Sequence, residues 1–78
     1  PLRVYPNPTG GLLNVELPVG SSRTHYEIYS VMGRQLSKGV IAGGANQTQV
    51  NLEGLPNGMY ILLFQRDGMT GRVRVRKE

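Results

Sequence analysis

The chain of 78 residues contains no cysteine and no tryptophan, and it has a single histidine and a single aspartate. Without cysteine the protein forms no disulfide and lacks the thiolate ligands of most structural zinc sites, so its stability must come from packing. One histidine, one aspartate and no Gly-x-Ser-x-Gly sequence do not supply a nucleophile, a base and an orienting group at a recognisable spacing. We therefore expect neither an active site nor a cofactor, and we expect the protein not to be an enzyme.

Long apolar runs are also missing from the chain. The longest one extends from Met59 to Phe64, whereas a helix that spans a bilayer needs roughly 18 apolar residues or more. No charged segment followed by an apolar stretch opens the chain in the manner of a signal peptide, and we expect no membrane-embedded segment. Because the chain begins at Pro1 and enters strand-like sequence at once, we also expect it to be a fragment of a longer protein.

The few residues that could bind a metal or perform acid-base chemistry are isolated. His25 needs ligand partners to hold a metal, and as a lone histidine on a strand it is more typical of a solvated surface. Glu16 and Glu27 could pair across strands as glycosidase carboxylates, but alternating glutamates usually mark the wet side of a sheet. We predict no metal site at any of them.

What the chain does have is a series of short apolar segments separated by turn-forming residues. Eleven glycines and five prolines fall almost wholly between these segments, where they favour turns. No segment has the period of a helix, and the pattern predicts seven strands, at residues 2–5, 12–17, 24–31, 35–41, 47–52, 59–64 and 72–77. The sequence therefore predicts one all-β domain, an Ig-like antiparallel β-sandwich of about seven short strands.

The strand from Met59 to Phe64 is apolar on both faces and is predicted to be central in its sheet. Turn chemistry precedes it, and Tyr60 follows Gly58 by two residues. This placement resembles a tyrosine corner, in which a tyrosine hydroxyl bonds to backbone a few residues upstream. We predict a structural corner made by Leu55, Gly58 and Tyr60, with the Tyr60 hydroxyl bonded to backbone within Gly54–Asn57.

Periodicity alone leaves open which face of this strand points inward, since both sets of side chains are apolar. The tyrosine corner favours Tyr60, Leu62 and Phe64 over Met59, Ile61 and Leu63. Elsewhere we expect Gly33 to adopt positive φ in a hairpin, Leu36 to point inward and Gly39 to form a bulge. The predicted core consists of Leu13, Val15, Ile28, Val50, Leu52, Leu55, Leu62, Phe64 and Val73.

Positive charge exceeds negative charge, with nine lysines and arginines against five acidic residues. In the last strand Arg72, Arg74 and Arg76 would form an outward row about 6 to 7 Å apart, with Val73 and Val75 inward. Too few aromatic residues are available to stack single-stranded nucleic acid, so we expect no nucleic-acid partner. Protection of a sheet edge is the simpler interpretation, and docking to an anionic protein or glycolipid surface stays open.

Four segments of the chain, in order, form a recognisable series that ends at the basic closing strand. They are Tyr5-Pro6-Asn7-Pro8-Thr9 with Gly11, Leu13 and Val15; Ile28-Tyr29-Ser30-Val31-Met32-Gly33-Arg34; Leu55-Pro56-Asn57-Gly58-Met59-Tyr60; and Val73-Arg74-Val75-Arg76-Lys77. Together they resemble the C-terminal sorting domain of the type IX (Por) secretion system of Bacteroidetes-type cells, and the resemblance covers essentially the whole chain.

The resemblance implies that residues 1–78 are a single C-terminal sorting domain behind the cargo domains of a larger secreted protein. Such a domain directs its cargo through the outer-membrane type IX translocon, from the periplasm to the cell surface or medium. A sortase-like peptidase then cleaves it off upstream of Pro1. The alternative is an Ig-like structural or adhesive accessory module of a cell-surface protein, and the identity of the cargo and the oligomeric state stay open.

Recognition by the translocon is expected at the closing strand, supported by the opening turn. A C-terminal strand at a sheet edge can use its free backbone groups to add to a receptor's sheet, while its arginines select an acidic partner. The residues predicted to carry this address are Val73, Arg74, Val75, Arg76 and Lys77 of the strand, and Tyr5, Pro6, Asn7 and Pro8 of the turn.

Overall fold

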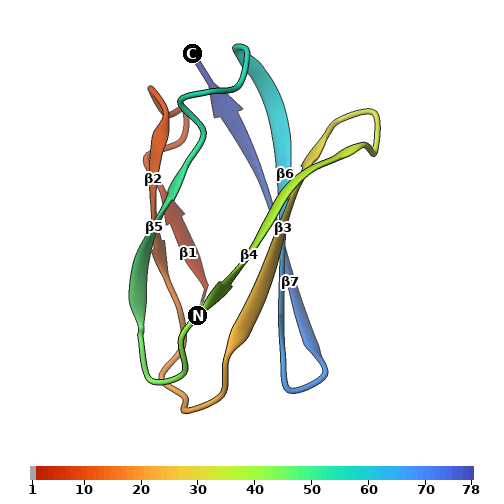
Figure 1. Cartoon of the computed structure of the whole chain (residues 1–78). Coiled ribbons are helices and arrows are strands. Elements are labelled where there is room, and N and C mark those ends of the chain that lie inside the picture. The colour runs from red at the N-terminus through yellow and green to blue at the C-terminus, as the bar shows by residue number, and fades with distance from the viewer. Residues whose placement is uncertain (1) are drawn as a thin grey trace.

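The computed structural model describes residues 2–78, which form two antiparallel sheets packed face to face (Figure 1). Within this range there are seven strands and no helix. One sheet has the order β1-β2-β5 and the other the order β4-β3-β6-β7, so the predicted all-β sandwich is confirmed. The strands are β1 (Arg3–Tyr5), β2 (Leu12–Glu16), β3 (Thr24–Ser30), β4 (Gln35–Ile41), β5 (Gln47–Asn51), β6 (Gly58–Arg66) and β7 (Met69–Lys77).

A search of residues 2–78 for a helix long and apolar enough to cross a membrane finds none.

The last two strands are longer than the sequence pattern indicated. The predicted strands 59–64 and 72–77 leave seven residues between them, but Arg66 pairs with Met69 and only Asp67 and Gly68 lie between these two. Both of these residues have positive φ, 51° and 76°, which is the geometry that a two-residue hairpin between twisted strands prefers. Because this turn is so short, pairing continues through residues that have no apolar alternation to indicate a strand.

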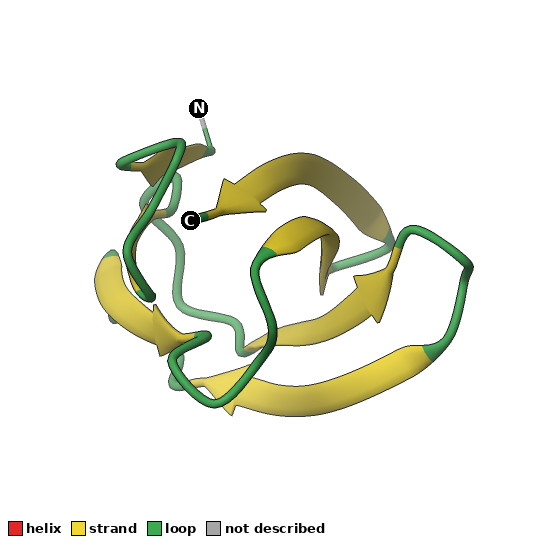
Figure 2. Cartoon of the chain, turned by 90° about the horizontal axis from the view of Figure 1, so that it is seen from above, coloured by secondary structure: helices red, strands yellow, loops and turns green. Residues whose placement is uncertain are grey.

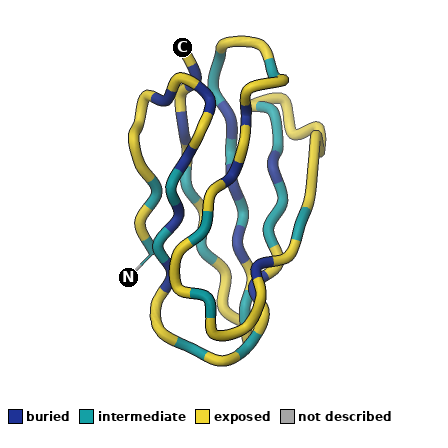
Figure 3. Tube along the Cα trace, turned by 60° about the vertical axis from the view of Figure 1, so that its left-hand side comes forward, coloured by how far each residue is buried: buried dark blue, intermediate teal, exposed yellow. Residues whose placement is uncertain are grey.

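The core lies between the two sheets, and buried and exposed residues alternate along most strands (Figure 3). Tyr60, Leu62 and Phe64 are buried, whereas Met59, Ile61 and Leu63 are only half-buried on the other face of β6. The predicted register of β6 is therefore confirmed. Leu55 and Val73 pack against the core while half-buried. The core also contains Leu17, Ile41 and Val75, which were missing from the predicted core, although Val75 was predicted to face inward.

Two expectations for β4 are wrong. Ile28 pairs with Ser37 and Tyr29 with Gln35, so Leu36 is the extra residue of a bulge and its side chain is 36% exposed. A bulge turns the unpaired residue out of the normal alternation, so Leu36 does not point inward. The bulge therefore lies three residues before Gly39 rather than at it, although Gly33 does have the predicted positive φ, 87°.

Gly39 is required because an aromatic ring lies over it. It pairs with Tyr26, and a Cβ added at Gly39 would lie 2.6 Å from the Tyr26 ring. That ring packs in turn on Phe64, with the centroids 6.4 Å apart. The missing side chain of Gly39 thus leaves the space that the Tyr26 ring occupies at the margin of the core.

We expect Gly39→Ala to lower the free energy of unfolding by about 1 to 3 kcal/mol, as overpacking typically does. Urea unfolding followed by circular dichroism measures the change. Gly54→Ala is the matched control, since nothing lies within 4 Å of an added Cβ there and we expect a change within about 0.5 kcal/mol. Equal stability of the two variants would show that Tyr26 moves aside at no cost.

Candidate recognition site

The two segments predicted to carry the address lie side by side, although they come from opposite ends of the chain. The backbone N–H of Thr9 donates to the Arg76 carbonyl at 2.8 Å, and the N–H of Glu78 donates to the Thr9 carbonyl at 2.9 Å. Seen from above, the C-terminus lies beside the layer that holds β1 and β2 (Figure 2). We call the contact between Asn7–Thr9 and Arg74–Glu78 the clasp.

Asn7 extends the clasp with its side chain. Its Nδ2 donates to the Arg74 carbonyl at 3.0 Å, and its Oδ1 accepts from the Arg76 N–H at 3.0 Å. A carboxamide carries one acceptor and two donors, so it can pair with β7 as a peptide group of a neighbouring strand would. An aspartate at this position would lose the donor. The asparagine of the opening turn therefore has a specific structural partner in the closing strand.

Thr9 joins the clasp to the core. Its side chain is 2% exposed, its Oγ1 donates to the Leu12 carbonyl at 2.6 Å, and the same oxygen accepts from the Gly11 N–H at 3.0 Å. The peptide bonds that precede Pro6 and Pro8 are both cis. The hydroxyl of Thr9 thus fixes the path by which the chain leaves the clasp and enters β2.

The clasp occupies part of the β7 edge to which a receptor's sheet was expected to bind. The outward backbone groups of Arg74, Arg76 and Glu78 are already bonded to Asn7 and Thr9. The expectation that free backbone groups of the closing strand add to a receptor's sheet therefore does not hold for this part of β7. What this part of the strand offers to a partner is side chains.

Side chains of the closing strand point in two directions. Val73, Val75 and Lys77 face the second sheet, and Lys77 is 8% exposed. The Nζ of Lys77 donates to Asn57 Oδ1 at 3.2 Å, which links β7 to the turn before β6. Arg74 and Arg76 face solvent on the opposite side.

The corner before β6 is formed as predicted. The Tyr60 hydroxyl donates to the Pro56 carbonyl, which lies within the expected range Gly54–Asn57, and Leu55 packs on the core. Gly58 has φ 155°, a value that residues with a side chain rarely adopt. The corner and Lys77 together fix the end of the sandwich at which β7 finishes.

We expect Tyr60→Phe to lower the free energy of unfolding by about 1 to 2 kcal/mol, because it removes the hydroxyl donor from the Pro56 carbonyl. Equilibrium unfolding in urea measures the change. Tyr26→Phe is the matched control, since no hydrogen bond of the Tyr26 hydroxyl is found among residues 2–78. A loss for Tyr60→Phe no larger than that of the control would contradict the role of the corner.

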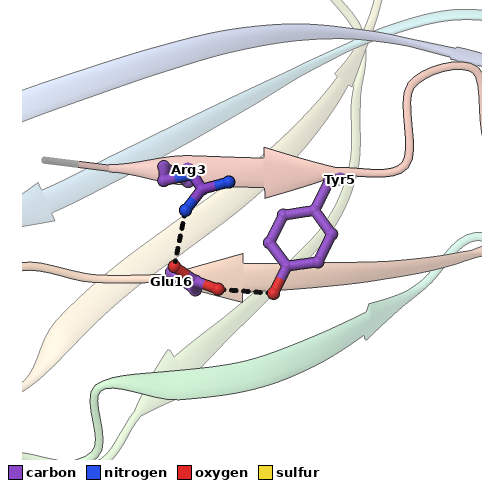
Figure 4. A network of polar contacts seen from close by, with 3 residues as sticks. All are labelled: Arg3, Tyr5 and Glu16. Carbon is purple, nitrogen blue, oxygen red and sulfur yellow. Dashed lines mark hydrogen bonds and ion pairs between the residues drawn. The ribbon is translucent and has the colours of Figure 1, made fainter.

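Tyr5 lies apart from the clasp, on the outer face of the three-stranded sheet. Its hydroxyl donates to Glu16, which raises the pKa of Tyr5, and Arg3 Nη1 lies 3.5 Å from Glu16 Oε1 (Figure 4). The Arg3 guanidinium also lies 5.5 Å from the centre of the Tyr5 ring. These contacts hold β1 on β2, so Tyr5 positions the segment that leads to Asn7.

The isolated polar residues stay apart in the fold. Glu16 lies on β2 and Glu27 on β3, in different sheets, and each points outward, so they form no carboxylate pair. His25 is exposed on β3. Residues 2–78 contain no group of three histidines, aspartates or glutamates that could hold a metal ion.

The chain is thus a small β-sandwich whose two end segments are bonded to each other at one edge, with outward arginines beside that contact. The comparison with protein families identifies it further. Residues 3–76 match the family described as the secretion system C-terminal sorting domain, and the chain belongs to this family. A search of curated proteins found no match to the chain.

This family is the sorting signal of cargo proteins of type IX secretion, and it marks proteins exported to the cell surface or the extracellular space. The resemblance inferred from the four sequence segments is therefore confirmed. The family is a signal domain and not a catalytic one, and the translocon machinery is the partner that such a signal implies.

Proposed function

We propose that this domain stands last in a larger secreted protein and that its folded β7, held by the clasp, carries the export address. The observation that supports this proposal is the clasp itself. Asn7 and Thr9 bond to the backbone of Arg74, Arg76 and Glu78, so the two segments expected to be recognised form one structural unit.

Within this unit the residues divide into two roles. Val73, Val75 and Lys77 hold β7 on the sandwich, because their side chains face the core or its margin. Arg74 and Arg76 face outward and present charge to the translocon. Guanidinium groups suit this task, since they are always charged and pair with carboxylates through two parallel hydrogen bonds.

The test is export of a reporter enzyme fused in front of residues 1–78 in a cell with a type IX system. We expect the parent fusion to reach the cell surface and R74E/R76E to reach it at least about ten-fold less, because like charges across an interface cost several kcal/mol. R23E/R34E is the matched control, since both residues are exposed elsewhere and the charge change is the same. Urea unfolding checks that all three domains are folded.

If the folded R74E/R76E variant were delivered at the parent level, the arginine address would be excluded. If R23E/R34E failed equally, net charge rather than position would control export. A parent fusion that stayed inside the cell would contradict the proposal as a whole.

We further propose that a sortase-like peptidase removes the domain at a junction on the N-terminal side of residue 1. The placement of β1 supports this, because β1 is an edge strand of its sheet and a chain that enters there is accessible. Mass spectrometry of the delivered reporter is expected to find it without residues 1–78. A reporter that keeps these residues at the cell surface would contradict cleavage.

A further inference from the structure

The outer faces of the two sheets differ in chemistry. The face of the three-stranded sheet is mainly polar, and on it Gln49 Nε2 donates to Asn14 Oδ1 at 3.2 Å. The other outward residues of this face are Arg3, Tyr5, Leu12, Glu16, Gln47 and Asn51. The outer face of the four-stranded sheet instead has an apolar line along β6, one of its two inner strands. It is formed by Met59, Ile61 and Leu63, and we call it the stripe.

Strand register places an arginine beside each residue of the stripe. Met59 pairs with Arg76, Ile61 with Arg74 and Leu63 with Arg72, and paired residues share a face of the sheet. On the other side, β3 places Tyr29 opposite Ile61 and Glu27 opposite Leu63. The stripe is thus bordered by a row of guanidinium groups on one side and by a tyrosine and a single carboxylate on the other.

The charge on this face is unbalanced. Within residues 2–78 no carboxylate lies within ion-pair distance of Arg72 or Arg74, and Arg76 pairs with Glu78 at 3.3 Å where both side chains are well exposed. The attraction within an exposed ion pair of this kind is weak. The arginine row is therefore available to carboxylates of a partner.

We infer that the outer face of the four-stranded sheet is the docking surface of this domain, and that its occupant is a protein surface with an apolar ridge bordered on one side by carboxylates. The inference rests on the proposed function and adds the stripe to the arginines. Charge complementarity identifies the occupant as acidic. The stripe identifies it as protein, because phosphate or sugar groups alone would leave three half-buried apolar side chains in contact with water.

The size of the surface fits a contact that forms and releases. Three alternate residues of a strand extend over about 13 Å, and β3 and β7 lie about 10 Å apart on either side of β6. An interface of these dimensions belongs to the small, transient class, and arginine is among the residues that contribute most to binding in such interfaces. A domain that must leave its receptor after delivery needs a contact of this kind.

The experiment compares delivery of the reporter fused to the parent domain, to I61T/L63T and to L12T. Threonine has the β-branched shape that strands favour, and Leu12 is a matched apolar residue, 45% exposed on the outer face of the other sheet. We expect I61T/L63T to lower delivery at least about ten-fold with its urea midpoint close to that of the parent, and L12T to be delivered normally. If the double variant unfolds, the single variant I61T is used in the same comparison.

Failure of this inference is distinguishable from failure of the proposed function. If the parent is delivered, R74E/R76E is not, and folded I61T/L63T is delivered at the parent level, only the docking face is excluded. A different outcome would be that the purified domain binds vesicles that contain phosphatidylglycerol and that I61T/L63T changes neither this binding nor delivery. The partner would then be an anionic lipid surface and not a protein. If the parent sedimented as a dimer and I61T/L63T as a monomer, the partner would be a second copy of this chain.

Discussion

A chain that ends at Gly71 is expected to be unfolded and to deliver none of its fused reporter. The truncation removes most of β7, including Val75, which is fully buried, and it leaves residues 58–63 of β6 unpaired along one edge. Each buried valine is worth about 1.5 to 3 kcal/mol, and a domain of this size has only about 5 to 15 kcal/mol in total. Circular dichroism at increasing urea and reporter activity at the cell surface are the two measurements.

Both results are expected together, because the address needs the folded domain. A truncated domain that stayed folded but was not delivered would assign the lost signal to the removed side chains alone. A truncated domain that was still delivered would contradict the role of β7 in sorting.

Opening the clasp is expected to have the second largest effect. The double variant N7A/T9V removes the two side-chain hydrogen bonds of Asn7 and the two of Thr9. At about 0.5 to 1.5 kcal/mol for each bond, the free energy of unfolding should fall by about 2 to 6 kcal/mol. Urea unfolding measures the loss. Asn14→Ala is the control, since among residues 2–78 this half-buried side chain bonds to that of Gln49 alone, and we expect less than about 0.5 kcal/mol.

Deletion of Arg76–Glu78 opens the clasp from the other side, because it removes the partners of Asn7 Oδ1 and of the Thr9 backbone. If the two segments act as one unit, N7A/T9V and the deletion should cost clearly less in combination than the sum of their separate costs. Full additivity would show that the opening turn and the closing strand are stabilised independently. The clasp would then contribute no coupling free energy between them.

Local patterns in the sequence predicted the strands and much of the core. The turn before Gly58 and the apolar run after it located β6. Because the hydroxyl of a buried tyrosine needs a hydrogen-bond partner, the corner predicted that the Tyr60 side of β6 faces inward. This choice placed Leu62 and Phe64 in the core and left Ile61 outside it, as the structure has them. Turn chemistry was sufficient because these contacts lie within a few residues along the chain.

Long-range contacts were not predictable in the same way. Asn7 was assigned to a turn because asparagine beside proline favours turns, and no local pattern indicates that its side chain bonds to Arg74 and Arg76 at the other end of the chain. Lys77 was assigned to the translocon address, and its burial was not predicted although it continues the inward alternation of Val73 and Val75. That alternation was the available signal for its burial.

The bulge in β4 was missed for a related reason. Leu36 is apolar, and period-two alternation assigned it inward, but the extra residue changes the register between Ile28 and Tyr29. A bulge is visible only when two strands are compared, so a single strand's pattern cannot locate it. Gly39 does not mark the bulge, because a glycine is needed at this position to leave room for the Tyr26 ring.

The central claim is that the export address is a folded surface assembled from both ends of the domain and not a linear C-terminal sequence. The most direct test compares a reporter fused to residues 1–78 with one fused to residues 69–78, the closing strand alone. We expect delivery to the cell surface only for the whole domain, because the strand alone lacks the clasp, the corner and the sheet that orient its arginines. Delivery of the ten-residue tail at the level of the whole domain would contradict the claim.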